Sequence, residues 1–167
     1  MTKRQEPITI GWAEVVELPE WGVRRLRAKV DTGARTSALH VENIEELPRG
    51  YVRFDVVLHR QKRDRRIHVK TKITRRGRVR SSTGHQTKRL FVSTLLRLGP
   101  IEKRVEISLV DREKMIHRML LGREALSGPI IIDVDRRMTL DSKKKVAKKK
   151  VIKKKVTKKK VSKRRRI

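Results

Sequence analysis

Apolar and polar residues alternate in short segments along most of the chain, and turn residues separate these segments. In residues 51–58 the apolar side chains recur at every second position from Val52 to Leu58, whereas Arg53 and Asp55 point to the other face. A period of two is that of a half-buried β-strand. The same pattern predicts further strands, which we place at residues 8–16, 23–30, 39–44, 67–73, 89–98, 105–109 and 115–121.

Helical periodicity is scarce. The best candidate is a short turn at residues 123–127, which Gly128 and Pro129 bring to an end. We therefore predict an all-β domain over residues 8–141, preceded by a flexible N-terminus at residues 1–7. A chain of 167 residues has room for one such domain and an appendage.

The appendage is a lysine-rich tail at residues 142–167. From Lys143 the unit Lys-Lys-Lys-Val-x occurs four times, and Lys-Arg-Arg-Arg-Ile follows. A five-residue period gives neither a helix nor a strand an apolar face, and repulsion between the lysines opposes compaction. We predict a disordered tail that binds polyanions without sequence preference. The cations assigned to this binding are Lys143, Lys144, Lys145, Lys148, Lys149, Lys150, Arg164, Arg165 and Arg166.

Charge and cysteine content narrow the class of protein further. The formal net charge is +29, and the tail contributes more than half of it. The sequence has no cysteine, no apolar leader after Met1, and no apolar run near the roughly 20 residues that cross a bilayer. These features predict a cytoplasmic protein with no membrane span.

The segment that carries candidate chemistry is Asp31-Thr32-Gly33, which follows a strand ending at Val30. A catalytic carboxylate needs a rigid strand behind it. It also needs a hydroxyl that can bond across a symmetric interface and a small residue that lets backbone amides approach. The strand that ends at Val30, the hydroxyl of Thr32 and the small residue Gly33 supply these three features in order. The tripeptide is equally compatible with an ordinary Asp-x-Gly hairpin turn.

A second segment favours the catalytic interpretation. An apolar pair precedes Gly122 and Arg123, and a short helical turn follows, although a core strand with a glycine bend would look the same. Taken together, residues 30–34, 36–39 and 120–123 resemble the retropepsins, the dimeric aspartic peptidases of retroviral type. The resemblance implies a small closed barrel of β-strands with one short C-terminal helix.

The resemblance extends to a bacterial group of retropepsin-like proteins that is often labelled ATP-dependent zinc protease and is associated with glutamate ligases of the RimK type. The matching stretches lie at residues 10–12, 28–39, 82–85, 96–99 and 118–126. Two positions depart from the pattern. Arg35 stands where viral retropepsins carry an acid that pairs with the arginine after the second glycine. Gln86-Thr87-Lys88 follows His85, where the bacterial group tends to carry an acidic residue.

A single Asp-Thr-Gly implies that a catalytic pair needs two chains. Two carboxylates about 3 Å apart share one proton, so that one deprotonates a water and the other donates to the substrate carbonyl. The body is too short for two lobes, so the partner of Asp31 must come from a second copy across a twofold interface. By resemblance, Asp31 activates the water, Thr32 cross-links the two loops and Gly33 permits close approach. The resemblance also implies supporting or substrate-binding roles for Ala34, Arg35, Leu121, Gly122, Arg123, Gly84 and His85.

Residues 75–89 contain Gly77 and Gly84 and few apolar side chains. They are the best candidate for a mobile hairpin that closes over substrate, and a plain exposed loop is the alternative. The five histidines show neither His-x-His nor His-Glu-x-x-His spacing, and no glycine-rich phosphate loop is visible. We therefore predict no metal and no cofactor.

The main hypothesis is a homodimeric aspartic peptidase that hydrolyses a peptide or isopeptide bond in a peptide or protein substrate. The basic body and the association with glutamate ligases favour acidic substrates. The alternative is a non-catalytic β-domain scaffold, which the tail anchors to nucleic acid, ribosomal surfaces or other polyanions. No membrane partner is expected.

Overall fold

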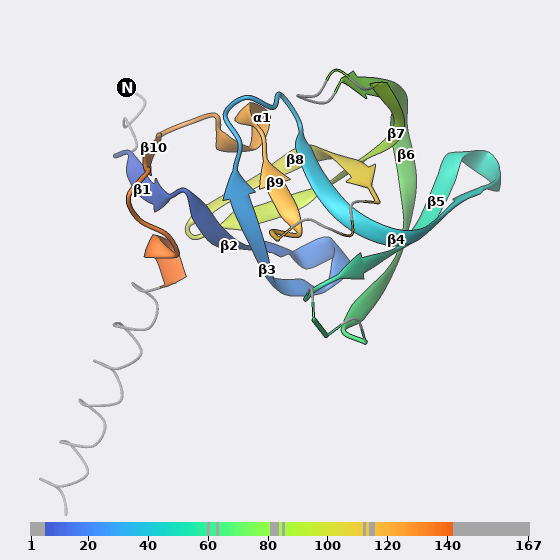
Figure 1. The fold of residues 1–167 in the computed structure, drawn as a ribbon, viewed down its shortest axis with the longest axis horizontal. Coiled ribbons are helices and arrows are strands. Elements are labelled where there is room, and N and C mark those ends of the chain that lie inside the picture. Colours follow the sequence, from blue (N-terminus) through green and yellow to red (C-terminus); the bar gives the residue numbers. More distant parts are fainter. Residues whose placement is uncertain are drawn as a thin grey trace, which may run out of the picture.

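The structure is a computed structural model, and it describes residues 6–59, 61–62, 64–80, 84, 86–111, 113 and 116–141. This part of the chain is built mostly of β-strands, with one short α-helix near its C-terminal end (Figure 1). The predicted all-β fold class is confirmed. Tail residues 142–167 lie outside the described ranges, as do residues 1–5 of the predicted N-terminal segment.

Ten strands and three short helices make up the described part of the chain. The strands are β1 Ile8–Gly11, β2 Ala13–Leu18, β3 Val23–Val30, β4 Ser37–Leu47, β5 Tyr51–Val57, β6 Arg66–Arg80, β7 Gln86–Leu98, β8 Ile101–Val110, β9 Met119–Leu121 and β10 Ile130–Asp133. The helices are η1 Pro19–Trp21, η2 Pro48–Gly50 and α1 Arg123–Leu126. None of the helices in these ranges is long and apolar enough to cross a bilayer.

Strands that depend on local alternation match their prediction, whereas a contact between residues distant in sequence divides the first predicted strand. β3 spans the predicted residues, because Leu26 and Ala28 face the core and the arginines between apolar positions are exposed. The predicted strand at 8–16 is divided at Trp12, whose amide donates to the carbonyl of Arg136 at 2.9 Å. β1 then pairs in parallel with β10, whereas β2 pairs antiparallel with β3.

One eight-stranded sheet holds most of the chain, in the order β2-β3-β9-β4-β5-β6-β7-β8. Additional pairings of β2 with β7 and of β4 with β8 fold this sheet back on itself. The terminal strands β1 and β10 form a separate two-stranded parallel sheet, with Ile8 opposite Ile130. In Figure 1 this small sheet lies at one side of the molecule, away from the β6–β7 hairpin.

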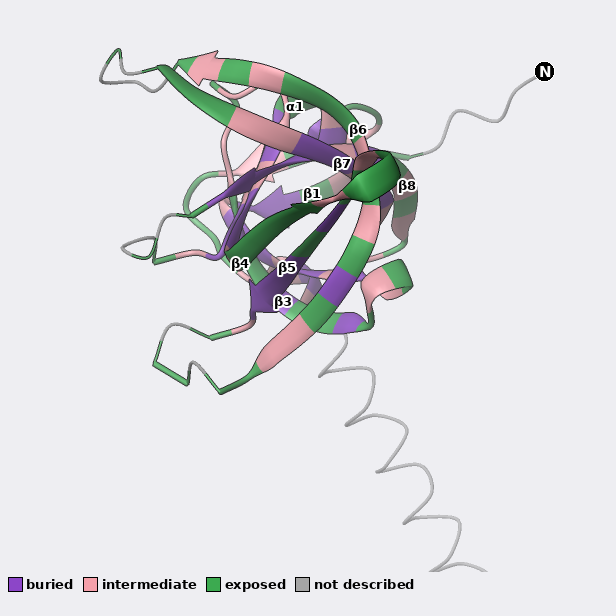
Figure 2. Ribbon diagram, turned by 90° about the vertical axis from the view of Figure 1, so that its right-hand side faces the viewer, coloured by how far each residue is buried: buried purple, intermediate pink, exposed green. Residues whose placement is uncertain are grey.

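The interior is almost entirely aliphatic. Leu39 of β4, Ile107 of β8, and Met119 and Leu121 of β9 are fully buried. Each such side chain stabilises the fold by about 1.5–3 kcal/mol relative to exposure in water. Figure 2 shows these buried stretches in the middle of the sheet, whereas the far ends of β6 and β7 are mostly exposed.

The chain after β10 returns to β2 and is fixed there by a buried carboxylate. Glu14 accepts hydrogen bonds from the amides of Gly11 at 2.8 Å, Thr139 at 2.9 Å and Leu140 at 3.4 Å. Gly11 allows this close approach, because a Cβ there would lie 2.5 Å from the carbonyl oxygen of Arg136. The C-terminal end of the domain is therefore held against the strands that lead to Asp31.

Candidate active site

Asp31 lies directly after β3, where the parallel ladder with β9 continues into a loop. Its amide donates to the carbonyl of Leu121 at 2.9 Å. Its Oδ1 accepts hydrogen bonds from the amides of Gly33 at 3.1 Å and Ala34 at 3.2 Å. No residue in the described ranges donates to Oδ2, and the side chain is half-buried. The loop therefore fixes one carboxylate oxygen and leaves the other open to a further partner.

The two residues after Asp31 differ in their contacts. A Cβ at Gly33 would lie 3.3 Å from Asp31 Oδ1, which is a tight contact, so a larger residue would crowd the carboxylate. Thr32 is exposed, and its hydroxyl bonds to none of the described residues. Its cross-linking role needs a second chain and stays a prediction.

Arg123, the first residue of α1, bonds to backbone carbonyls of the loop at residues 31–35, which we call the Asp31 loop. Its Nη1 donates to the carbonyls of Thr32 and Gly33, both at 2.9 Å. Its own amide donates to the carbonyl of Ala34 at 2.9 Å. Hydrogen bonds from a charged donor are worth about 1.5–3 kcal/mol each, so this contact fixes the loop strongly.

Gly122 sits where no other residue would fit. A Cβ at this position would lie 2.6 Å from the backbone carbonyl carbon and oxygen of Thr36. The Gly122 amide also donates to the hydroxyl of buried Ser37 at 3.2 Å. Together with Leu121, which accepts from the Asp31 amide, this residue joins β9 to both sides of the Asp31 loop.

Arg35 and Glu124 form the ion pair that joins the loop to α1. Arg35 Nε lies 2.9 Å from Glu124 Oε1, and the Glu124 amide donates to the Arg35 carbonyl at 3.1 Å. Viral retropepsins place the acid in the loop and the arginine after the glycine. Here the loop carries Arg35, the arginine after the glycine is kept as Arg123, and the acid that pairs with the loop is the next residue, Glu124.

Lys103 on β8 is a supporting residue that the sequence did not indicate. Its Nζ donates to the carbonyl of Glu124 at 2.8 Å, to the carbonyl of Ser127 at 3.0 Å and to the Ser127 hydroxyl at 2.7 Å. A lysine at the C-terminal end of a helix satisfies carbonyls that have no partner within the helix. Lys103 thus anchors the end of α1 that lies opposite to the Asp31 loop.

The predicted hairpin at residues 75–89 exists as paired strands and not as a loop. Cross-strand pairs of β6 and β7 continue from Ile73 and Val92 out to Arg80 and Gln86. Gly84 in the connection has a φ of 84°, a conformation that favours glycine. His85 and residues 81–83 lie outside the described residues. Closure of this hairpin over a substrate stays a prediction.

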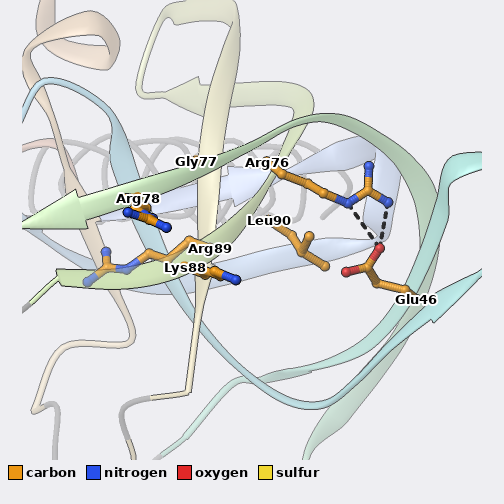
Figure 3. A pocket seen from close by; sticks show the side chains of 7 residues that line it. All are labelled: Glu46, Arg76, Gly77, Arg78, Lys88, Arg89 and Leu90. Carbon is orange, nitrogen blue, oxygen red and sulfur yellow. Dashed lines mark hydrogen bonds and ion pairs between the residues drawn. The ribbon is translucent and has the colours of Figure 1, made fainter.

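A cavity of about 500 Å³ lies along the β6–β7 hairpin. Its lining residues are Glu46, Arg76, Gly77, Arg78, Lys88, Arg89 and Leu90. Arg76 Nη2 lies 2.5 Å from Glu46 Oε2 at one end, and the other three cations gather away from this pair (Figure 3). Leu90 is the one large apolar side chain of the lining, and it also packs against the hydrophobic core. Such a cavity favours an anionic occupant.

Histidines do not gather into a metal site in the described part of the chain. No group of three or more His, Cys, Asp or Glu side chains there has the arrangement that a metal ion needs. His40 is buried in β4, and His68 on β6 contacts Asp55 at 2.5 Å. The zinc label of the bacterial group therefore has no fitting donor set among these residues, and no chemical step is assigned to a metal.

Comparison with known proteins places the whole β domain in one family. The sequence model of the RimB-like family, described as the retropepsin-like aspartic endopeptidase RimB, matches residues 9–144. Among curated proteins, a probable alpha-L-glutamate ligase of Shewanella pealeana is 36% identical over 139 residues, which are 80% of this chain and 30% of that protein. One of Desulfotalea psychrophila is 36% identical over 129 residues, which are 74% and 27%. The chain thus spans about 30% of the length of these relatives.

A solved structure shares the fold. The crystal structure of a Legionella pneumophila protein of unknown function superposes with a TM-score of 0.65 and 26% sequence identity. The match covers 79% of this chain and 97% of the Legionella chain.

Proposed function

This chain belongs to the RimB-like family of retropepsin-like aspartic endopeptidases, and we propose that it is an aspartic peptidase that acts as a homodimer. The observation that carries the proposal is the half-site at Asp31. Two backbone amides hold Oδ1, while Oδ2 accepts from none of the described residues. One such carboxylate is half of an acid–base pair, and a second copy supplies the other half.

The chemistry of the pair follows from its shared proton. The ionised Asp31 takes a proton from a water molecule, whose oxygen attacks the carbonyl carbon of the peptide bond. The protonated Asp31 of the second copy donates to the carbonyl oxygen. When the tetrahedral intermediate collapses, the carbon–nitrogen bond breaks, the leaving nitrogen takes the proton that the first Asp31 accepted from water, and the second Asp31 recovers its proton from a hydroxyl of the intermediate. No cofactor is required by this sequence.

The loop supports this reaction through rigidity. Arg123 holds two loop carbonyls, and the amides of Gly33 and Ala34 hold Oδ1. A fixed carboxylate loses little freedom when the transition state forms. In the dimer, Thr32 hydroxyls from the two chains would bond across the twofold axis and keep the two loops in register.

The substrate in this proposal is an acidic peptide or protein segment. The relatives that contain a matching stretch are named as glutamate ligases, enzymes whose name implies that they add glutamate. The cavity on the β6–β7 hairpin carries Arg78, Lys88 and Arg89, which suit carboxylate side chains. The proposed hydrolysis would then act on peptide or isopeptide bonds near glutamates.

The test compares the wild-type chain with Asp31→Asn on glutamate-rich peptides between about pH 4 and pH 8. Asparagine keeps the shape of the side chain but can neither lose nor carry the shared proton. We expect hydrolysis by the wild type and its loss in Asp31→Asn. The matched control is Asp135→Asn, which removes an exposed carboxylate far along the chain and should leave hydrolysis unchanged. No hydrolysis by the wild type at any pH would favour a non-catalytic scaffold.

We also propose that the tail at residues 142–167 binds polyanions. The supporting observation is its content of 16 basic residues and no acid. Binding through released counterions weakens steeply as salt rises and depends little on sequence. Affinity of the full chain for a single-stranded oligonucleotide, measured at several salt concentrations, tests this: a flat salt dependence would contradict it.

A further inference from the structure

The outward face of β3 carries a row of charges that ends at Asp31. Successive residues of a strand point to opposite faces, so Arg27, Lys29 and Asp31 share one side. Leu26 and Ala28 occupy the other side and are fully buried. Lys29 therefore lies about 7 Å along the strand from Asp31, on the face that presents the carboxylate.

Trp12 borders this row and is held in place by its backbone. Its carbonyl accepts a hydrogen bond from the amide of Val30 at 2.9 Å, and its amide donates to the carbonyl of Arg136 at 2.9 Å. The Trp12 ring meets the imidazole of His117 edge to face, with ring centroids 5.7 Å apart and planes at 85°. Trp12 and His117 thus form an aromatic border beside the charged row.

The positive charges of Lys29, Arg27 and Arg137 all act on the imidazole of His117, and we name the four residues the basic cluster. Burial lowers the pKa of His117, and the charges of Lys29, Arg27 and Arg137 lower it further. His117 Nδ1 is buried and has no hydrogen-bond partner among the described residues. The imidazole therefore lies in a positive electrostatic environment, and its Nδ1 has no hydrogen-bond partner among the described residues.

The basic cluster has no internal counter-charge. None of Arg27, Lys29 and Arg137 forms an ion pair within the part of the chain that the structure describes. Other arginines of the domain are paired, as Arg25 is with Asp141 at 3.0 Å and Arg104 is with Glu20. Like charges held close together repel one another, and an anion bound between them would relieve that repulsion.

We infer that the basic cluster is a subsite that binds a carboxylate side chain of the substrate next to the bond that Asp31 cleaves. The inference rests on the proposed peptidase function and names the residues that would select an acidic side chain close to the reaction. Lysine offers a compact charge and arginine a planar fork, and both suit a carboxylate. The Trp12 ring would cover the methylene groups of a glutamate.

The proposed subsite should bind a glutamate side chain more tightly than a glutamine side chain. The two side chains have nearly the same shape, so packing against Trp12 hardly distinguishes them. Only glutamate carries the charge that the cations would compensate, and glutamine would leave their repulsion in place. Selectivity for glutamate at one substrate position is therefore the signature of the cluster.

The experiment measures binding without cleavage, in the full chain carrying Asp31→Asn. The probes are a synthetic hexaglutamate peptide and a set of variants with glutamine at single positions, titrated by calorimetry. In this background we expect Lys29→Gln to weaken hexaglutamate about tenfold. At the peptide position that faces the cluster, glutamine should then bind as well as glutamate. The matched control is Arg24→Gln, which removes the same charge from another exposed position of β3.

Two outcomes overturn the inference. In the first, Lys29→Gln leaves the ratio of the affinities for glutamate and glutamine peptides unchanged. In the second, Arg24→Gln weakens hexaglutamate binding as much as Lys29→Gln does. Circular dichroism checks that each variant is folded, and Lys29→Met serves as a second substitution. The titrations test binding independently of hydrolysis. If the wild type hydrolyses nothing, the peptidase proposal fails, but the titrations still show whether the cluster binds a carboxylate. If it hydrolyses acidic peptides, Lys29→Gln should raise KM about tenfold and change kcat little.

Discussion

The guanidinium of Arg35 contacts the carboxylate of Glu124, with Nε 2.9 Å from Oε1, and this pair ties the Asp31 loop to the helix that follows Gly122. Both partners reach solvent, with side-chain exposures of 81% and 40%. An exposed ion pair contributes only about 0–1 kcal/mol to stability. Its value to the protein therefore lies in the position that it gives the loop.

Exchange of these two charges separates positioning from stability. We expect Arg35→Glu and Glu124→Arg each to lower kcat on acidic peptides about tenfold, because a small displacement of the loop misplaces Asp31. Each single change should alter the free energy of unfolding by less than about 1 kcal/mol. The double variant restores the pair with reversed sign and should recover most of kcat. A double variant no better than the worse single one would contradict the positioning role.

Lys103→Met should destabilise the domain. The substitution removes three hydrogen bonds to the C-terminal end of α1 and leaves the carbonyls of Glu124 and Ser127 without this donor. We expect the free energy of unfolding in urea to fall by about 1–3 kcal/mol. Lys72→Met is the matched control, because Lys72 is exposed on β6, and its effect should stay within about 0.5 kcal/mol. Equal effects of the two variants would refute the anchoring of α1.

Gly122→Ala should lower the free energy of unfolding more than the addition of one methyl group suggests. The new methyl group would lie 2.6 Å from the backbone of Thr36, which cannot move without distorting the Asp31 loop. We expect a loss of about 3 kcal/mol in the free energy of unfolding. Gly50→Ala is the comparison, because its φ of 74° is unfavourable for alanine but no atom lies within 4 Å. That variant should lose about 1 kcal/mol, and a Gly122→Ala variant as stable as Gly50→Ala would contradict the contact.

Features of the fold that depend on residues close in sequence could be predicted, whereas features that depend on contacts between distant residues could not. Strand β3, the Asp31 loop and helix α1 follow from local alternation and short motifs, and each was predicted within a few residues. The division of the first strand at Trp12 could not be predicted, because it depends on β10, which pairs with β1 from about 120 residues away. The contact between Lys103 and α1 has the same origin, since the lysine and the helix meet only when β8 is in place.

Buried His40 predicts that stability depends on pH. Burial lowers the pKa of His40, and the nearby charge of Arg118 lowers it further, against the opposing effects of Glu42 and Asp111. Below about pH 6.5 the unfolded chain gains a proton on this histidine that the folded chain resists. The unfolded state then binds more protons, so the free energy of unfolding falls as pH decreases through this window.

The measurement is urea unfolding at several pH values between about 5 and 7. His40→Gln cannot gain the proton and should flatten the decline, although His117, whose pKa is lowered chiefly by burial, leaves a part of it. An identical decline in wild type and His40→Gln would show that His40 is not responsible.

The most direct measurement of the central claim mixes wild-type chains with the Asp31→Asn variant at constant total concentration and allows subunits to exchange. If each active site takes one Asp31 from each chain, only dimers of two wild-type chains are active, and activity falls with the square of the wild-type fraction. An equal mixture should then keep about one quarter of the activity. A linear decline, with about one half remaining, would show that one chain carries a complete site and would contradict the account.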